Sequence, residues 1–152
     1  LDKYPMKRVT LDSELQALRL YLDIEKVRFE ERLQVICEVA TDCNLALVPS
    51  MILQPLAENA IKHAVAVQEE GGSINISVRR FGNDLLIELA DNGPGADIKN
   101  GNLFRENGVG LVNTRERLQA LYQNDFSLVV ANNVPTGVKI SIRIPYEVGG
   151  RI

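Results

Sequence analysis

Apolar residues recur with helical spacing near the start of the chain. They stand at positions 11, 15, 18, 22 and 29. Asp12 and Glu14 fall in the first turn of this segment, where carboxylates interact favourably with the helix dipole. The pattern predicts a helix over residues 11–29. A second apolar stripe follows the same segment and consists of Ala17, Leu20, Tyr21, Ile24 and Val27. This stripe indicates either a well-buried helix or a face that meets an upstream segment or a partner chain.

Alternating apolar and polar residues, rich in branched side chains, predict strands farther along the chain. The predicted strands cover residues 33–40, 73–80, 84–90, 126–131 and 138–144. Two more helices are predicted, one from about Ser50 or Pro55 to Val67 and one over residues 109–123. Residues 91–108 contain several glycines and no periodicity, which indicates a long functional or mobile loop.

The helices alternate with hairpins of strands and not with single strands. Phe81-Gly82-Asn83, for example, separates two predicted strands and is typical of a hairpin turn. A doubly wound parallel sheet is therefore excluded. The pattern predicts an α+β fold, in which a layer of helices packs on a mixed sheet.

The composition is that of one globular domain. The chain has 152 residues, and 17 basic against 20 acidic side chains give a net charge of −3. This balance argues against binding to nucleic acid or to an anionic membrane surface. The longest uncharged run begins at Cys43 and contains two prolines, so no segment is apolar enough to cross a membrane.

Few side chains are available for metal or nucleophilic chemistry. Cys37 and Cys43 are six positions apart without a second pair, which fits neither a zinc ribbon nor a disulfide framework. We expect both to be reduced, cytosolic thiols. His63 is the only histidine, so a metal site with two or three histidines is excluded. Because the sequence begins at Leu1 without Met, we expect it to be a piece of a longer protein.

Three polar side chains gather on one side of the second predicted helix. At about 100° per residue, Asn59, Lys62 and His63 lie close together around the helix axis. The apolar face opposite them consists of Leu53, Leu56, Ala57, Ala60, Ile61, Ala64 and Val67. An Asn oxygen is a neutral ligand for Mg²⁺, and a Lys supplies charge to phosphates. The set indicates a phosphate-facing surface or, alternatively, the solvated face of an amphipathic helix.

Two glycine motifs follow this helix. Asp91-Asn92-Gly93-Pro94-Gly95 comes directly after a strand, where a carboxylate can accept a hydrogen bond from an exocyclic amine and glycines admit a flat ring. The alternative is a plain turn. Gly108-Val109-Gly110-Leu111 opens the third helix, whose unpaired N–H groups favour a phosphate. Each motif alone is weak evidence, but their order along the chain predicts a nucleotide site.

These segments resemble the N box and glycine boxes of the ATPase superfamily shared by histidine kinases, Hsp90, gyrase B and MutL. Within that superfamily, residues 53–63, 110–118 and 14–32 resemble the LytS/AlgZ-like branch of sensor histidine kinases. The resemblance implies a two-layer α/β sandwich of the Bergerat type, with a mostly antiparallel sheet covered on one face by helices. It also implies that residues 1–32 are a linker helix from a dimerisation and phosphoacceptor segment, and that residues 33–152 are the catalytic ATP-binding domain.

The resemblance assigns roles to the motif residues by position. Asn59 would ligate Mg²⁺, with Lys62 and His63 near the triphosphate of ATP. Asp91 would accept from the adenine amine. The first glycine motif, with Gly93 and Gly95, would line the base pocket. The second motif would hold the phosphates through Gly108, Gly110 and Leu111, under a lid over residues 96–107. Arg105 in that lid would either approach the γ-phosphate or remain a solvated loop residue, whereas Arg115 and Arg117 are expected at the surface or in salt bridges.

Two positions depart from the superfamily pattern. Members that hydrolyse ATP have a Glu four residues before the Asn, and here that position is Pro55. Glu58 is turned about 100° away, so it is a weaker candidate for a base, and no catalytic residue is assigned. The family often has Gly-Thr before the last strand, where this chain has Gly137-Val138. Thr136 is the one nearby residue that would replace the missing hydroxyl.

The resemblance therefore implies a protein-histidine kinase fragment of a two-component phosphorelay, inactive in autophosphorylation because the acceptor histidine lies upstream. Its implied partners are ATP, that histidine segment in the same protein or its dimer mate, and a downstream response regulator. A cytoplasmic location is implied, with the parent protein attached to the membrane. The alternatives are an ATP-driven switch of the Hsp90 or MutL type, an anti-sigma serine kinase, and a degenerate module that binds a protein and no nucleotide.

Overall fold

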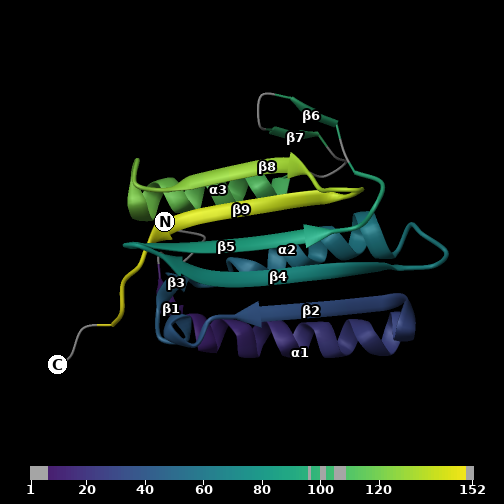
Figure 1. Ribbon diagram of the computed structural model, residues 1–152, viewed down its shortest axis with the longest axis horizontal. Coiled ribbons are helices and arrows are strands. Elements are labelled where there is room, and N and C mark those ends of the chain that lie inside the picture. The colour runs from purple at the N-terminus through teal and green to yellow at the C-terminus, as the bar shows by residue number, and fades with distance from the viewer. Residues whose placement is uncertain (1–6, 96, 100–101, 105–108, 150–152) are drawn as a thin grey trace.

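In the computed structural model, three helices cover one face of a five-stranded sheet (Figure 1). The structure describes residues 7–95, 97–99, 102–104 and 109–149. The helices are α1 (Leu11–Phe29), α2 (Leu53–Ala60) and α3 (Val109–Tyr122), with short turns η1 (Glu30–Arg32), η2 (Thr41–Cys43) and η3 (Ile61–Val65). The strands are β1 (Arg8–Thr10), β2 (Leu33–Val39), β3 (Leu47–Pro49), β4 (Gly72–Phe81), β5 (Asp84–Asp91), β6 (Asp97–Lys99), β7 (Asn102–Phe104), β8 (Ser127–Asn132) and β9 (Val138–Pro145).

The central sheet has the strand order β2-β4-β5-β9-β8. Its β2 and β4 pair in parallel, with Leu33 opposite Gly72, and the other neighbours pair antiparallel. The parallel pair follows from the connection, because the chain passes through α2 between these two strands and needs such a crossover to return in the same direction. The predicted α+β fold with a mixed, mostly antiparallel sheet is confirmed.

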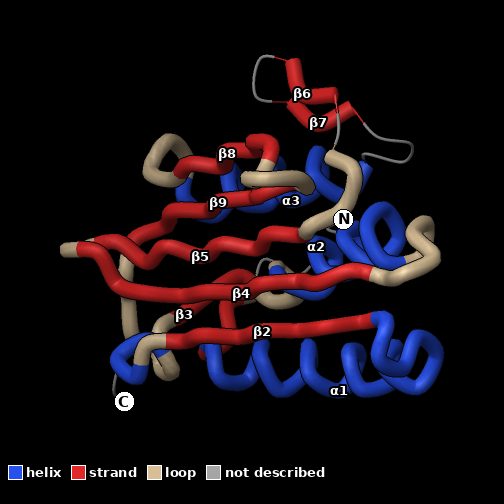
Figure 2. Tube along the Cα trace, turned by 45° about the vertical axis from the view of Figure 1, so that its right-hand side comes forward, coloured by secondary structure: helices blue, strands red, loops and turns tan. Residues whose placement is uncertain are grey.

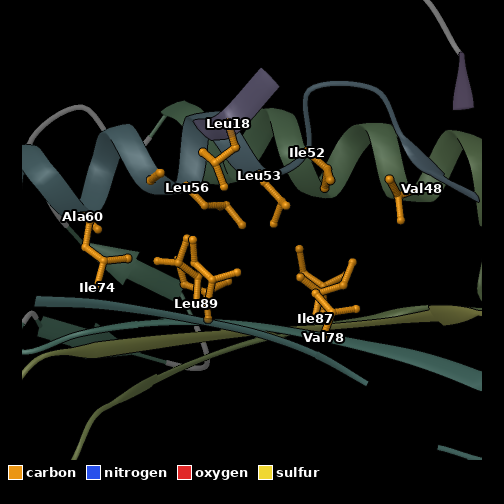
Figure 3. Close-up of a cluster of buried hydrophobic side chains, with 14 of the residues drawn as sticks. Leu18, Val48, Ile52, Leu53, Leu56, Ala60, Ile74, Val78, Ile87 and Leu89 are labelled. Carbon is orange, nitrogen blue, oxygen red and sulfur yellow. The ribbon is translucent and has the colours of Figure 1, made fainter. Parts of the chain in front are cut away.

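The core lies between the helices and the sheet. Figure 3 shows Leu53 and Leu56 of α2 pointing toward Ile87 and Leu89 of β5, and all four are buried. In the turned view of Figure 2, α2 and α3 lie behind the central sheet, and α1 runs along its edge strand β2. Helix α1 contributes to the same core, through Leu11, Leu15, Leu18, Leu22 and Phe29. A division of the chain after residue 32 stays a prediction, although α1 packs on the same sheet as the rest.

The second apolar stripe of α1 is not buried in this chain. Leu20, Ile24 and Val27 are 69%, 68% and 81% exposed. Helix α1 lies along β2, the edge strand of the sheet, so it has a neighbour on one side only (Figure 1). The alternative of a well-buried helix is therefore wrong, and contact of this stripe with an upstream segment or a partner chain stays a prediction.

Three details differ from the sequence predictions. The β1–β3 pair was not predicted, because its strands are only three residues each and too short to show a period. The predicted loop over residues 91–108 contains the short hairpin β6–β7. The second helix stops earlier than expected, and Val67, placed on its apolar face by the spacing, is 63% exposed. The reason is the π-helical turn η3, which changes the spacing after Ala60.

Candidate functional site

Asp91 ends β5 and is almost fully buried, with 4% of its surface exposed. Its Oδ1 accepts hydrogen bonds from the backbone N–H of Gly93 at 3.0 Å and of Val138 at 3.1 Å. A carboxylate fixed by backbone groups of two separate segments has a set orientation. The backbone N–H of Val138 thus contacts the carboxylate at the position where members of the superfamily that the sequence resembles often have Thr.

Gly137 is required by its closeness to the backbone of Asp91. Its φ is +109°, and a Cβ built there would lie 1.9 Å from the Asp91 carbonyl oxygen. That same oxygen accepts a hydrogen bond from the Asn133 side-chain amide at 2.9 Å. The Thr136 hydroxyl donates to the Asn92 carbonyl at 3.2 Å. The turn before β9 therefore packs directly on the predicted base-binding motif.

The motif after β5 also contacts the end of the second helix. A Cβ at Gly93 would lie 2.7 Å from the Cβ of Ala64, so only glycine allows this approach. The neighbouring Asn92 accepts from the backbone N–H of Ser73 at 2.8 Å, which ties the motif to the start of β4. The structure thus brings together two of the three predicted motifs.

The three polar residues of the second helix lie across a change in helix type. Asn59 is in α2 and half-buried, whereas Lys62 and His63 are in the π-helical turn η3, exposed and half-buried respectively. Turns of this kind are rare and occur frequently at functional sites. The structure therefore keeps these three side chains outside the core, on a segment whose geometry sequence spacing alone did not predict.

No acid or base stands where hydrolytic members of the superfamily that the sequence resembles have one. Pro55 is in the first turn of α2, where its missing N–H leaves no gap in the helix hydrogen bonds. Glu58 is exposed and accepts a hydrogen bond from the Gln54 side chain at 3.0 Å. Its carboxylate is thus engaged with the preceding turn of the helix surface.

Helix α3 starts at the same end of the sheet as these groups. Figure 1 shows the end of β5, the end of α2 and the start of α3 at that end, below the β6–β7 hairpin. Gly110 and Leu111 are in the first turn of α3. Gly108 lies outside the described residues, as do residues 96, 100–101 and 105–107 of the predicted lid, Arg105 among them.

Within the described part of the chain, no group of three or more His, Cys, Asp or Glu side chains is arranged to hold a metal ion.

Both cysteines are free; Cys37 is exposed and Cys43 is buried. Burial, with a smaller contribution from Asp42, raises the pKa of the Cys43 thiol to about 11.

Among the helices that the structure describes, none has the length and hydrophobicity needed to span a membrane.

Two residues that sequence reasoning did not assign to the site act on α2 from other helices. Glu14 of α1 is buried, and Arg117 of α3 donates to the backbone before α2. Arg117 is half-buried, and its guanidinium donates to backbone carbonyls, a role that the expectation of a surface or salt-bridge residue did not include. Arg115 likewise donates to the Leu128 carbonyl at 3.1 Å. Both Glu14 and Arg117 lie in the segments that resemble sensor histidine kinases, and this resemblance was the only sequence signal that pointed to them.

Comparison with known proteins agrees with this geometry. Residues 46–148 match the model of the family described as histidine kinase-, DNA gyrase B-, and HSP90-like ATPase. The chain is 34% identical over 146 residues to the sensor histidine kinase BtsS of Escherichia coli K12, covering 95% of this chain and 25% of BtsS. It is 32% identical over 147 residues to the sensor protein LytS of Staphylococcus saprophyticus, covering 91% of this chain and 25% of LytS. The chain thus spans about a quarter of the length of these relatives.

A solved structure supports the fold. The catalytic domain of histidine kinase ThkA superposes with a TM-score of 0.72 at 18% identity, and the match covers 94% of this chain and 98% of that domain. The predicted Bergerat-type sandwich and the resemblance to sensor histidine kinases, LytS among them, are confirmed.

Proposed function

The chain belongs to the family of histidine kinase-, DNA gyrase B- and HSP90-like ATPases, and from this membership we propose that it binds ATP as the catalytic domain of a two-component sensor histidine kinase. In this role it donates the γ-phosphoryl group to a histidine outside the chain. The observation that carries the proposal is the buried Asp91 carboxylate, oriented by the N–H groups of Gly93 and Val138 beside the polar end of α2.

Asp91 accepts a hydrogen bond from the exocyclic amine of adenine. A carboxylate is an acceptor only, so it favours adenine over a base that presents a carbonyl at the same position. Gly93 and Gly95 follow without side chains, and Gly95 has a φ of +86°. The flat face of the base can then approach the backbone of this turn.

The phosphates lie between α2 and the start of α3. Lys62 and His63 provide positive charge or hydrogen-bond donors, and the first turn of α3, with Gly110 and Leu111, provides backbone N–H groups. The sequence motif adds Gly108, which lies outside the described residues. Asn59 is half-buried and offers an amide oxygen, which fits Mg²⁺ because that ion keeps waters and binds substrate phosphates. When bound, Mg²⁺ neutralises phosphate charge.

The arrangement favours transfer to an external acceptor over hydrolysis. Phosphoryl transfer depends mainly on positioning and electrostatic stabilisation, which the polar side of α2 and the α3 N-terminus supply. Attack by water needs a positioned base, and Pro55 occupies the position of that base in hydrolytic members. This favours a kinase over an ATP-driven switch of the Hsp90 or MutL type.

The partners of the proposed kinase follow from the same role. The acceptor is a histidine in an upstream segment of the same protein or of its dimer mate, and a response regulator then takes the phosphoryl group. We place this domain on the cytoplasmic side of the membrane to which the parent protein is attached, because ATP is supplied there.

Calorimetric titration with a non-hydrolysable ATP analogue, with and without Mg²⁺, tests the proposal, and a phosphate-release assay with ATP follows it. Micromolar binding that Mg²⁺ strengthens, with negligible phosphate release, is the expected result. Steady release would favour the hydrolytic switch. Absence of binding would overturn the assignment and leave a module that binds a protein partner.

A further inference from the structure

Helix α2, which carries Asn59, has no N-terminal cap of its own. Ile52 precedes the helix without a side-chain hydrogen bond, and the first turn contains no acidic residue. The Glu14 carboxylate of α1 supplies the missing acceptors: Oε2 accepts from the Leu53 N–H and Oε1 from the Met51 N–H, both at 3.0 Å. Helix α1, which is distant from α2 in sequence, therefore caps α2. The capping carboxylate is buried, because Glu14 is only 4% exposed.

The same turn is bound from its other side by Arg117 of α3. The guanidinium donates to the Met51 carbonyl at 3.1 Å and also to the Ser50 carbonyl. Met51 therefore has its N–H bound by one charged side chain and its carbonyl by another. Its φ is +60°, a left-handed conformation that costs about 1 kcal/mol for a residue with a side chain and persists only where neighbours impose it.

The turn over residues 50–52 sets the position of α2 along α3. The two helices run in opposite directions on the sheet (Figure 1). Gly110 lies seven residues before Arg117, about 10 Å along α3, and Asn59 lies six residues after Leu53, about 9 Å along α2. With Arg117 beside the start of α2, Asn59 comes level with Gly110. A displacement at the turn would change the spacing between these two positions.

We propose that Glu14 and Arg117 are positioning residues of the nucleotide site. By binding the turn over residues 50–52 from α1 and from α3, they fix the register in which Asn59 faces the phosphate-binding start of α3. Neither residue touches the nucleotide. This inference rests on the proposed function, since it concerns the metal and phosphate side of the ATP site, and it predicts that adenosine binding does not depend on either residue.

The test uses the variants Arg117→Met and Glu14→Gln in the full chain. Met keeps the length of the side chain without a donor, and Gln can present its single oxygen to only one of the two N–H groups. For each variant, calorimetry measures the affinity for adenosine and for the non-hydrolysable ATP analogue, with and without Mg²⁺. We expect the strengthening by Mg²⁺ to fall at least about tenfold, because small displacements of binding groups have large effects, while adenosine affinity is unchanged.

Matched controls separate this role from a general loss of stability. Arg115→Met removes a hydrogen bond of the same kind from the same helix, but to the Leu128 carbonyl of β8. Glu25→Gln neutralises a carboxylate of α1 that pairs with Arg28 of the same helix. Both control variants should retain the full effect of Mg²⁺. Arg117→Lys, which keeps one donor site, should recover part of the loss.

The outcomes are distinct. If the unaltered chain binds neither adenosine nor the analogue, the proposed function fails and the positioning roles fail with it. If it binds both and the two variants respond to Mg²⁺ as the unaltered chain does, only the positioning roles are overturned. Equal losses for adenosine and the analogue would also overturn them, because they would indicate general unfolding. Should Glu14→Gln not fold, Arg117→Met and Arg117→Lys decide the question, with the Leu53 amide signal in NMR spectra reporting on the turn.

Discussion

The base side and the phosphate side of the proposed site are built in different ways. Asp91 is oriented by backbone N–H groups of the turn that follows it, at Gly93, and of the start of β9, at Val138. Asn59, by contrast, is on a helix whose start is bound by Glu14 and Arg117, far from it in sequence. Changes on the base side should therefore reduce the binding of adenosine and ATP alike, whereas changes on the phosphate side should weaken the binding of ATP and leave that of adenosine unchanged.

The largest expected effect is that of Asp91→Asn. The amide oxygen can still accept from both backbone N–H groups, so the fold should persist, but the amide nitrogen would present donors to the adenine amine. Two hydrogen-bond donors would then face each other without an acceptor between them. This costs about 3 kcal/mol of binding free energy, or about 100-fold in affinity, which calorimetry with adenosine and the ATP analogue would detect. Asp84→Asn, at the other end of β5, is the control and should bind normally. Unchanged affinity in Asp91→Asn would contradict the adenine assignment.

Gly137→Ala tests whether the base side depends on close backbone packing. A Cβ there would collide with the Asp91 carbonyl, in addition to the strain of a φ of +109°. We expect a loss of roughly 3 kcal/mol in the free energy of unfolding, measured by urea denaturation.

The control for this variant is Gly82→Ala. Gly82 also has a positive φ, of +63°, but nothing lies within 4 Å of the added Cβ. Its loss should be about 1 kcal/mol, the conformational cost alone. Equal losses in the two variants would show that the contact between Gly137 and Asp91 contributes little.

Asn59→Ala should act on the phosphate side alone. Removing one neutral metal ligand should weaken binding of the ATP analogue about tenfold in Mg²⁺ and little in its absence. Adenosine affinity and the melting temperature should change little, because the Asn59 side chain is only half-buried. Asn75→Ala, at an exposed position of β4, is the matched control. Equal weakening with and without Mg²⁺ would indicate a folding defect and not a lost ligand.

The smallest expected effect is that of Val138→Thr, which introduces the hydroxyl found in many family members. The backbone N–H of Val138 already binds the Asp91 carboxylate, and this bond does not depend on the side chain. We expect the affinity for the ATP analogue to change by less than about threefold, within the contribution of one neutral hydrogen bond. A tenfold gain would show that this chain binds adenine less tightly than its fold allows.

Much of the fold could be predicted from local patterns. The limits of α1 and α3 and the four antiparallel strands of the sheet follow the spacing of apolar residues closely. Asp91 was placed at the end of a strand by the residues around it, and there it lies. The mixed sheet also followed, because hairpins imply antiparallel neighbours. Repeating or strictly local signals of this kind survive without knowledge of the tertiary structure.

Other features had no local signal. The π-helical turn η3 shifted Val67 out of the core, and the apolar stripe at Leu20, Ile24 and Val27 proved exposed. A spacing rule assumes one helix type throughout, and it cannot tell a helix at the edge of a sheet from one at its centre. Both errors arise where the answer depends on what lies beside the segment.

The sequence by itself determined the order of the motifs, the elements that carry them and the residue types able to bind a nucleotide. These follow from short-range periods and from the chemistry of single side chains. Only the tertiary structure decided that Glu14 caps α2 and that Arg117 binds the backbone before it. A backbone N–H or carbonyl at a helix end can be satisfied by any suitable side chain that packing brings near, and the packing of three helices on one sheet is not encoded in the spacing within any one of them.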